Sequence, residues 1–144
     1  MRRGASRARR DRGAKVPILL QRFHERGGHV GGQRCARRAA ETSGAIVVFK
    51  GPDTVVAHPD GRASVAANAP PWLATAGSGD VLAGLIAGLA ARGTPPEQAA
   101  VWGVALHAAA GRAFAARLGA VGFLARELND VVPALMHGYA APPR

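Results

Sequence analysis

The spacing of apolar residues changes along the chain and predicts strands first and helices afterwards. Residues 45–51 (AIVVFKG) form a continuous, largely β-branched run, which is typical of a strand buried on both faces. Residues 54–68 predict two short strands joined by a turn at Pro59, Asp60 and Gly61. From residue 79 to about 91 the apolar residues recur at helical spacing, at Val81, Leu82, Leu85, Ile86 and Leu89.

Two more helices are expected in the last third of the chain. Residues 94–119 are apolar on most sides, and Thr94 with Glu97 three residues later forms a capping-box pattern at their start. Residues 124–136 are amphipathic and include a proline. In the helix over 79–91, Gly84 and Gly88 weaken helix propensity, so we expect another element to pack closely there. Strands followed by helices indicate a layered α/β structure.

The N-terminal segment has a different character. Residues 1–35 show neither helical nor strand periodicity and are rich in Arg and Gly, so we expect them to be disordered, with a folded domain over 36–140. Arg37 to Gly44 suits the end of a helix that stops at glycine.

The net charge of +10 is concentrated at the N-terminal end. Residues 1–44 hold 12 Lys and Arg against 3 Asp and Glu, whereas residues 45–144 hold 7 against 6. Two interpretations stay open: a disordered or aberrant leader, which we favour, or a basic arm that binds nucleic acid through residues 1–44. No nucleic-acid fold motif supports a specific nucleic-acid partner.

Composition excludes several classes of site. The single cysteine, Cys35, excludes an internal disulfide and a cysteine-based zinc site. The histidines show no metal-ligand spacing, so we expect no protein-held metal. No apolar run reaches the roughly 20 residues of a membrane helix, so we expect no membrane association and a cytoplasmic location.

The candidate chemistry begins at Gly77, Ser78, Gly79 and Asp80, a loop of small residues that runs into a helix N-terminus. The first N–H groups of a helix have no internal partners, and glycine lets them approach an anion such as phosphate. Asp80 would repel a phosphate, but it could accept the proton of a hydroxyl that attacks one. The alternative is that Asp80 merely caps the helix. The loop lacks the Gly-Lys-Ser/Thr ending of a Walker loop.

A second candidate segment follows the buried strand, at Lys50, Gly51, Pro52, Asp53 and Thr54. Ligands of open α/β sheets bind outside the carboxyl ends of the strands. Lys50 can neutralise phosphate, and Thr54 and the Gly51 backbone can add hydrogen bonds; the alternative for Lys50 is a solvated strand end. The two segments together favour a nucleotide site.

Two residues near these segments also need an interpretation. His107 lies in the apolar helix, where we expect a packed, hydrogen-bonded side chain. Trp72 could lie near the nucleotide or anchor the loop.

The strings VVFKGPDTVVAHPDGR and ATAGSGDVLAG resemble the C-terminal half of the ADP/ATP-dependent NAD(P)H-hydrate dehydratases of the ribokinase-like superfamily. The resemblance runs from about Arg37 to Tyr139. It implies the C-terminal part of a ribokinase-like α/β fold. It implies that Asp80 is the catalytic base and contacts the hydrate, that Gly79 contacts the nucleotide phosphate, and that residues 50–54 bind the nucleotide.

The resemblance also implies a reaction. The hydroxyl of hydrated NADH or NADPH (NADHX or NADPHX) attacks the terminal phosphate of ADP or ATP, phosphate is then eliminated, and Mg²⁺ is expected. The family's catalytic domain is about twice this length, so we expect impaired activity of this chain, an exposed sheet edge and a homo-oligomer. The enzyme alternative is a small-molecule kinase of the same superfamily, which would accumulate a phosphorylated product.

Overall fold

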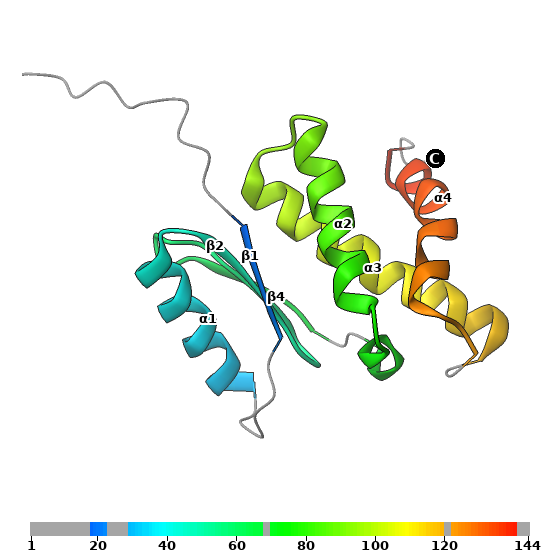
Figure 1. Ribbon diagram of the computed structural model, residues 1–144, viewed down its shortest axis with the longest axis horizontal. Coiled ribbons are helices and arrows are strands. Elements are labelled where there is room, and N and C mark those ends of the chain that lie inside the picture. The colour runs from blue at the N-terminus through cyan, green and yellow to red at the C-terminus, as the bar shows by residue number, and fades with distance from the viewer. Residues whose placement is uncertain (1–17, 23–28, 68–69, 120–121, 141–144) are drawn as a thin grey trace, which may run out of the picture.

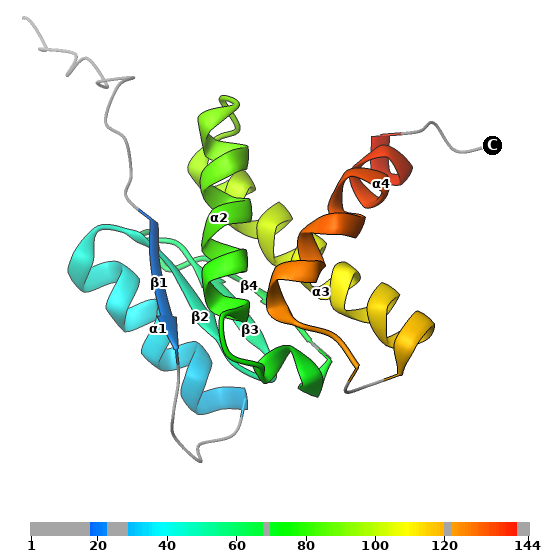
Figure 2. The same ribbon diagram turned by 45° about the vertical axis from the view of Figure 1, so that its right-hand side comes forward.

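Four strands form one mixed sheet. The computed structural model describes residues 18–22, 29–67, 70–119 and 122–140. The strands lie in the order of the chain: β1 (Ile18–Arg22), β2 (Ile46–Lys50), β3 (Thr54–Ala57) and β4 (Ala63–Ala66). Figure 1 shows the sheet with β1 in front, and Figure 2 labels all four strands. β1 runs parallel to β2, with Ile18 beside Ile46 and Arg22 beside Lys50, and the other two pairs are antiparallel.

Helices cover both faces of this sheet. Helix α1 (His29–Ser43) lies on one face, against β2 and β3. On the other face lie α2 (Ser78–Ala91) and α3 (Pro96–Leu118), and α4 (Leu128–Ala140) packs on α3 farther from the sheet (Figures 1 and 2). Two short 3₁₀ helices, η1 (Pro71–Ala74) and η2 (Ala125–Glu127), precede α2 and α4. The layered α/β architecture expected from the sequence is confirmed.

β2 divides the core into two parts because successive side chains of a strand point to opposite faces. Ile46 and Val48 pack with α2 and α3, whereas Val47 and Phe49 pack with α1. The first four residues of β2 are all buried, which explains why this stretch is apolar at every position. A third cluster joins η1, α3 and α4 around Leu73, Phe114 and Leu128.

Most elements expected between residues 37 and 140 are present. The hairpin turns between Ala57 and Ala63, and Gly61 adopts a φ of +87°, which favours glycine. Helix α1 ends at Ser43, and Gly44 follows it with a φ of +65°. Helix α2 begins one residue earlier than expected. The last expected helix is divided into η2 and α4, and Pro133 lies inside α4.

The folded part begins before the expected boundary at residue 36. Residues 18–22 form β1 and pair with β2 along their whole length, and α1 begins at His29. The expectation of disorder through residue 35 is therefore wrong for residues 18–22 and 29–35. Residues 1–17 and 23–28 lie outside the described part of the chain.

Close packing between α2 and α3 depends on a different glycine from those expected. A Cβ atom built at Gly84 or Gly88 would meet no atom of the described structure within 4 Å, so the expected close approach at these glycines is wrong. At Gly103 of α3 a Cβ atom would lie 2.4 Å from Cγ1 of Ile86. The two helices therefore approach each other at Gly103.

The expected capping box at Thr94 and Glu97 is also wrong. Helix α3 begins at Pro96 after Pro95, and none of the described side chains caps it. The Glu97 carboxylate instead accepts two hydrogen bonds from the Arg62 guanidinium, at 2.9 and 3.2 Å. This pair joins the tip of the β-hairpin to the start of α3.

Among the described residues, helix α3 is long and apolar enough to cross a membrane by length and composition, although charged residues interrupt its apolar run. However, 61% of its most apolar window is buried inside the fold. The buried residues contact the sheet, α2 and η1. We therefore describe α3 as the central core helix of this structure.

Candidate functional site

The first part of the candidate site lies where β2 ends. Lys50 is half-buried, and its ammonium group donates a hydrogen bond to the Leu73 carbonyl oxygen at 2.9 Å. Leu73 belongs to η1, which leads into the glycine loop. Lys50 is therefore not a solvated strand end: it connects the end of the sheet to the segment before α2.

Residues 51–54 form a tight connection between β2 and β3. The Thr54 hydroxyl donates to the Gly51 carbonyl oxygen at 3.4 Å, and Thr54 is buried. Gly51 and Asp53 are half-buried and Pro52 is exposed. The Thr54 hydroxyl thus has a local partner, and the accessible part of this connection is its tip.

The second part is the start of α2. Gly77 precedes the helix with a φ of +81°, a conformation that a side chain would strain. The N–H groups of Asp80 and Val81 both donate to the Gly77 carbonyl, and that of Ser78 donates to Thr75. Among the described residues, the N–H of Gly79 has no acceptor. It is therefore a donor available to a ligand at this helix end.

Asp80 lies in the first turn of α2 and is exposed. No side-chain hydrogen bond caps this helix within the described structure. Asp80 therefore makes no capping hydrogen bond, and the structural role left to it is that of a negative charge in the first turn of a helix. Its carboxylate and the unpaired Gly79 N–H belong to the same turn, so a group bound at the helix end would lie beside the carboxylate.

A buried pair of residues supports this turn from below. His107 of α3 lies under Ser78, and their exposed fractions are 4% and 0%. The His107 Nε2 atom lies 2.9 Å from the Ser78 hydroxyl oxygen and 3.0 Å from the Ser78 carbonyl oxygen. The expectation of a packed, hydrogen-bonded histidine is confirmed.

The electrostatic surroundings keep His107 neutral. Burial and, to a smaller extent, the nearby Lys50 ammonium lower the pKa of its imidazole to about 4, while the hydrogen bond to Ser78 acts in the opposite direction. A neutral imidazole carries one N–H. Because a carbonyl oxygen can only accept, the contact with the Ser78 carbonyl assigns that proton to Nε2.

Trp72 anchors the loop to α3. Its indole N–H donates to the Gly111 carbonyl at 3.3 Å. A Cβ atom at Gly111 would lie 2.8 Å from the Leu73 side chain, so this glycine lets η1 approach the helix. Of the two interpretations of Trp72, the structure supports the anchor. Sequence reasoning missed Gly103 and Gly111, and the available signal was a glycine within an otherwise apolar helix.

These contacts bring together some of the predicted site residues and leave others apart. Lys50, Ser78 and His107 meet between the sheet and α2. Gly79 and Asp80 lie at the open end of the helix. The connection at residues 51–54 is joined to the segment before α2 through Lys50, which donates a hydrogen bond to the Leu73 carbonyl. The described residues contain no group of three or more His, Cys, Asp and Glu side chains that could hold a metal ion.

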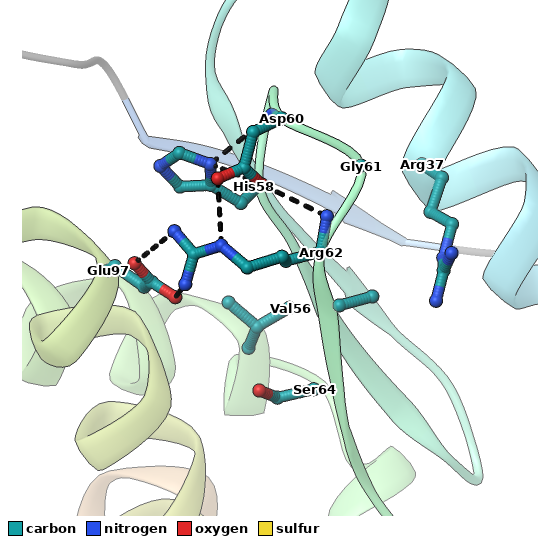
Figure 3. A pocket seen from close by; sticks show the side chains of 9 residues that line it. Arg37, Val56, His58, Asp60, Gly61, Arg62, Ser64 and Glu97 are labelled. Atoms are coloured by element: carbon teal, nitrogen blue, oxygen red, sulfur yellow. Dashed lines mark hydrogen bonds and ion pairs between the residues drawn. The ribbon is translucent and has the colours of Figure 1, made fainter.

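A polar hollow of about 650 Å³ lies at the other end of the hairpin (Figure 3). Arg62 pairs there with Asp60 at 2.7 Å as well as with Glu97, and His58 lies 2.8 Å from Asp60. Arg37 of α1 borders the hollow on the opposite side from Glu97. Because β3 leads from the candidate site to this turn, the two regions lie at opposite ends of the sheet.

Comparisons with known proteins agree with this description. The family profile for NAD(P)H-hydrate dehydratase matches residues 27–134. The ADP-dependent (S)-NAD(P)H-hydrate dehydratase of Xanthomonas campestris pv. campestris is 54% identical over 91 residues, which are 63% of this chain and 32% of the relative. A bifunctional NAD(P)H-hydrate repair enzyme of Escherichia coli is 43% identical over 105 residues, which are 72% of this chain and 20% of the relative.

Solved structures extend the similarity to the fold. An ADP/ATP-dependent NAD(P)H-hydrate dehydratase of Bacillus subtilis, co-crystallised with ATP and Mg²⁺, superposes with a TM-score of 0.76 and 29% identity. The match covers 85% of this chain and 48% of that one. A ribokinase-like superfamily protein of Enterococcus faecalis superposes with a TM-score of 0.67 and 25% identity, over 87% of this chain and 45% of that one.

The matches identify the family and also show that this chain contains only part of the length of its relatives. The chain spans about a third of the Xanthomonas relative and about half of the Bacillus chain. The matched region starts at residue 27, ten residues before the start that the sequence motifs indicated. This chain, which the family profile matches over residues 27–134, belongs to the NAD(P)H-hydrate dehydratase family and has a ribokinase-like fold.

Proposed function

We propose that this chain carries the nucleotide half of an ADP- or ATP-dependent dehydratase that repairs NADHX and NADPHX. The observation that carries the proposal is the start of α2, where the Gly79 N–H, which no described residue accepts, and the exposed Asp80 carboxylate share one turn. The dipole of α2 and the Gly79 N–H group together favour the binding of a phosphate. The Asp80 carboxylate beside them is suited to act as a base.

The residues divide the chemistry between them. A terminal phosphate of ADP or ATP would bind at the N–H of Gly79, with Gly77 and Ser78 shaping the loop. Lys50 lies beneath the loop and adds positive charge, and residues Gly51, Pro52, Asp53 and Thr54 offer their exposed tip to the rest of the nucleotide. Asp80 would contact the hydrate and accept the proton of its hydroxyl group.

The reaction balances without a redox step. The hydroxyl oxygen of the hydrate bonds to the terminal phosphorus, the bond from that phosphorus to its bridging oxygen breaks, and AMP or ADP leaves. The C–O bond of the phosphorylated ring then breaks as a neighbouring ring carbon loses a proton. The products are NADH or NADPH, inorganic phosphate and the shortened nucleotide.

Mg²⁺ fits this arrangement as a companion of the nucleotide. The described residues offer no dedicated metal cage, and Mg²⁺ is commonly held by substrate phosphates with one or two carboxylates. When bound it would neutralise charge on the phosphates. The loop backbone and Lys50 would orient them.

The proposal also covers the cellular location and the oligomeric state of this chain. Because the proposed repair reaction consumes ADP or ATP, we expect the chain to act in the cytoplasm, where these nucleotides are abundant. β1 and β4 are the outer strands of the described sheet, and unpaired strand edges favour association, so we expect a homo-oligomer. Solution scattering tests this point, and a compact, stable monomer would contradict it.

The activity is tested by incubating the chain with NADHX, ADP and Mg²⁺ and following NADH, AMP and phosphate. We expect the three products in equal amounts. A stable phosphorylated product without NADH would support the alternative of a small-molecule kinase. A chain that binds ADP and releases none of these products would contradict the proposed activity. Salt-sensitive DNA binding that is lost when the basic residues 1–17, which precede β1, are removed would support the nucleic-acid alternative of an arm within residues 1–44.

A further inference from the structure

The peptide group between Ser78 and Gly79 combines two observations about the start of α2. Its carbonyl oxygen belongs to Ser78 and lies 3.0 Å from Nε2 of His107. Its N–H belongs to Gly79 and has no acceptor among the described residues. Because a peptide unit is planar and trans, its C=O and N–H point in opposite directions, so fixing one fixes the other.

We propose that His107 is a positioning residue, which holds the Ser78–Gly79 peptide plane so that the Gly79 N–H points out of the helix end toward a phosphate oxygen. This inference rests on the proposed nucleotide site and adds a residue to it. His107 acts through Ser78 and stays buried beneath the helix.

Three features of the structure support this role. First, Nε2 contacts both the hydroxyl and the carbonyl oxygen of Ser78, so the side chain and the backbone are held from one atom. Second, a hydrogen bond to a carbonyl oxygen polarises the amide and makes its N–H a stronger donor. Third, a Cβ atom built at Gly79 would meet no described atom within 4 Å outside its own turn, so the surface beside this residue is open.

The surroundings of the imidazole suit a donor that stays neutral. The charged group that acts on the imidazole is the Lys50 ammonium at the end of β2, which donates a hydrogen bond to the Leu73 carbonyl. A protonated imidazole would be buried beside this cation. The neutral ring with its proton on Nε2 avoids that repulsion and still donates to the Ser78 carbonyl.

The first test reads the ring and the helix start without any nucleotide. Nitrogen NMR of the imidazole should show the proton on Nε2 at neutral pH. In His107→Leu, we expect faster hydrogen exchange at the Leu82 amide, whose helical acceptor is the Ser78 carbonyl, and greater mobility at Gly79. The Ala90 amide, near the other end of α2, should be unchanged. A proton on Nδ1, or a helix start unaffected by His107→Leu, would overturn the proposal.

The second test measures ADP affinity by titration calorimetry in the presence of Mg²⁺. His107→Leu removes the donor and should weaken ADP binding about tenfold. His107→Gln returns an amide N–H near the position of Nε2 and should restore affinity to within about threefold of the unmodified chain. His58→Gln, at the far end of the hairpin, is the matched histidine control and should bind ADP as the unmodified chain does.

The outcomes separate the two proposals. If the unmodified chain does not bind ADP, the proposed nucleotide site fails, while the NMR measurements still decide what His107 does. If the chain binds ADP and His107→Leu binds it equally well, the positioning role is wrong. If His107→Leu does not fold, two other measurements still decide the positioning role. The imidazole NMR of the unmodified chain overturns the role if the proton lies on Nδ1, and the ADP affinity of His107→Gln supports it if affinity stays within about threefold of the unmodified chain.

Discussion

The two regions at opposite ends of the sheet are both held by polar contacts between distant segments, but they are built differently. At the candidate site, a buried neutral pair, His107 and Ser78, joins α3 to α2. At the other end, exposed charged groups, Asp60, Arg62 and Glu97, join the hairpin to α3. Buried hydrogen bonds are costly to lose, whereas exposed ion pairs contribute little and are screened by salt. We therefore expect the two ends to respond differently to substitution, pH and salt.

The largest difference should appear between the two aspartates. Asp80→Asn removes the proposed base and should lower turnover by about 10²–10⁴-fold while ADP binding is largely kept. Asp60→Asn, in the exposed network, should leave turnover unchanged. The measurement is NADH formation from NADHX at saturating ADP. Equal turnover in Asp80→Asn and the unmodified chain would return Asp80 to a structural role.

The pH dependence of stability should reveal the buried histidine. The pKa of His107 is about 4 in the folded chain and 6.5 in the unfolded one, so between these values only the unfolded chain is protonated there. The free energy of unfolding should therefore fall by roughly 2–4 kcal/mol as the pH drops from 6.5 to about 4.

The exposed end should respond in a lower pH window. Hydrogen bonds from Arg62 lower the pKa of Asp60 from 3.8 to about 2, so its contribution is lost only as the pH falls through that range. Denaturant titrations at several pH values check both windows. His107→Gln should remove the dependence between pH 6.5 and 4, and its persistence would contradict the assignment to His107.

Packing beneath the candidate site gives the next largest effect. Gly103→Ala places a Cβ atom 2.4 Å from Ile86 and should lower the free energy of unfolding by about 1–3 kcal/mol. Gly88→Ala, on the open face of α2, should raise it by up to about 1 kcal/mol because alanine favours helix. Thermal unfolding compares the two variants. Equal effects would mean that α2 and α3 do not approach each other at Gly103.

The smallest effect should come from the exposed network. Glu97→Gln removes the partner of the Arg62 guanidinium on α3 and should change the unfolding midpoint less than Gly103→Ala does. High salt should erase this small difference. A larger loss than that of Gly103→Ala, or one that persists in high salt, would show that the hairpin end is held more firmly than its exposure suggests.

The sequence predicted those parts of the molecule that local pattern determines. The buried run of β2, the hairpin turn at Gly61 and the helical spacing of α2 carry their structure in consecutive residues, and all three are confirmed. β1 could not be predicted from local pattern because its five residues form a strand by pairing with β2, and 23 residues separate the end of β1 from the start of β2. Its arginine- and glycine-rich surroundings concealed it.

The same distinction applies to the candidate site. The glycine loop before α2 and the lysine after β2 were predicted from their positions at element ends. The partner of each could not be predicted: Lys50 donates to the Leu73 carbonyl, 23 residues away, and Ser78 contacts His107, 29 residues away. The roles of Asp80, of Gly77 to Gly79 and of residues 50–54 in binding and catalysis stay predictions.

The most direct test of the central claim is a calorimetric titration of the unmodified chain with ADP in the presence of Mg²⁺. We predict saturable binding at one site, lost or weakened when Gly79 is replaced by valine and unchanged in the Asp60→Asn control. Absence of binding by a sample whose cooperative thermal unfolding shows that it is folded would contradict the account. The start of α2 would then be a feature of the family's fold without a working nucleotide site in this chain.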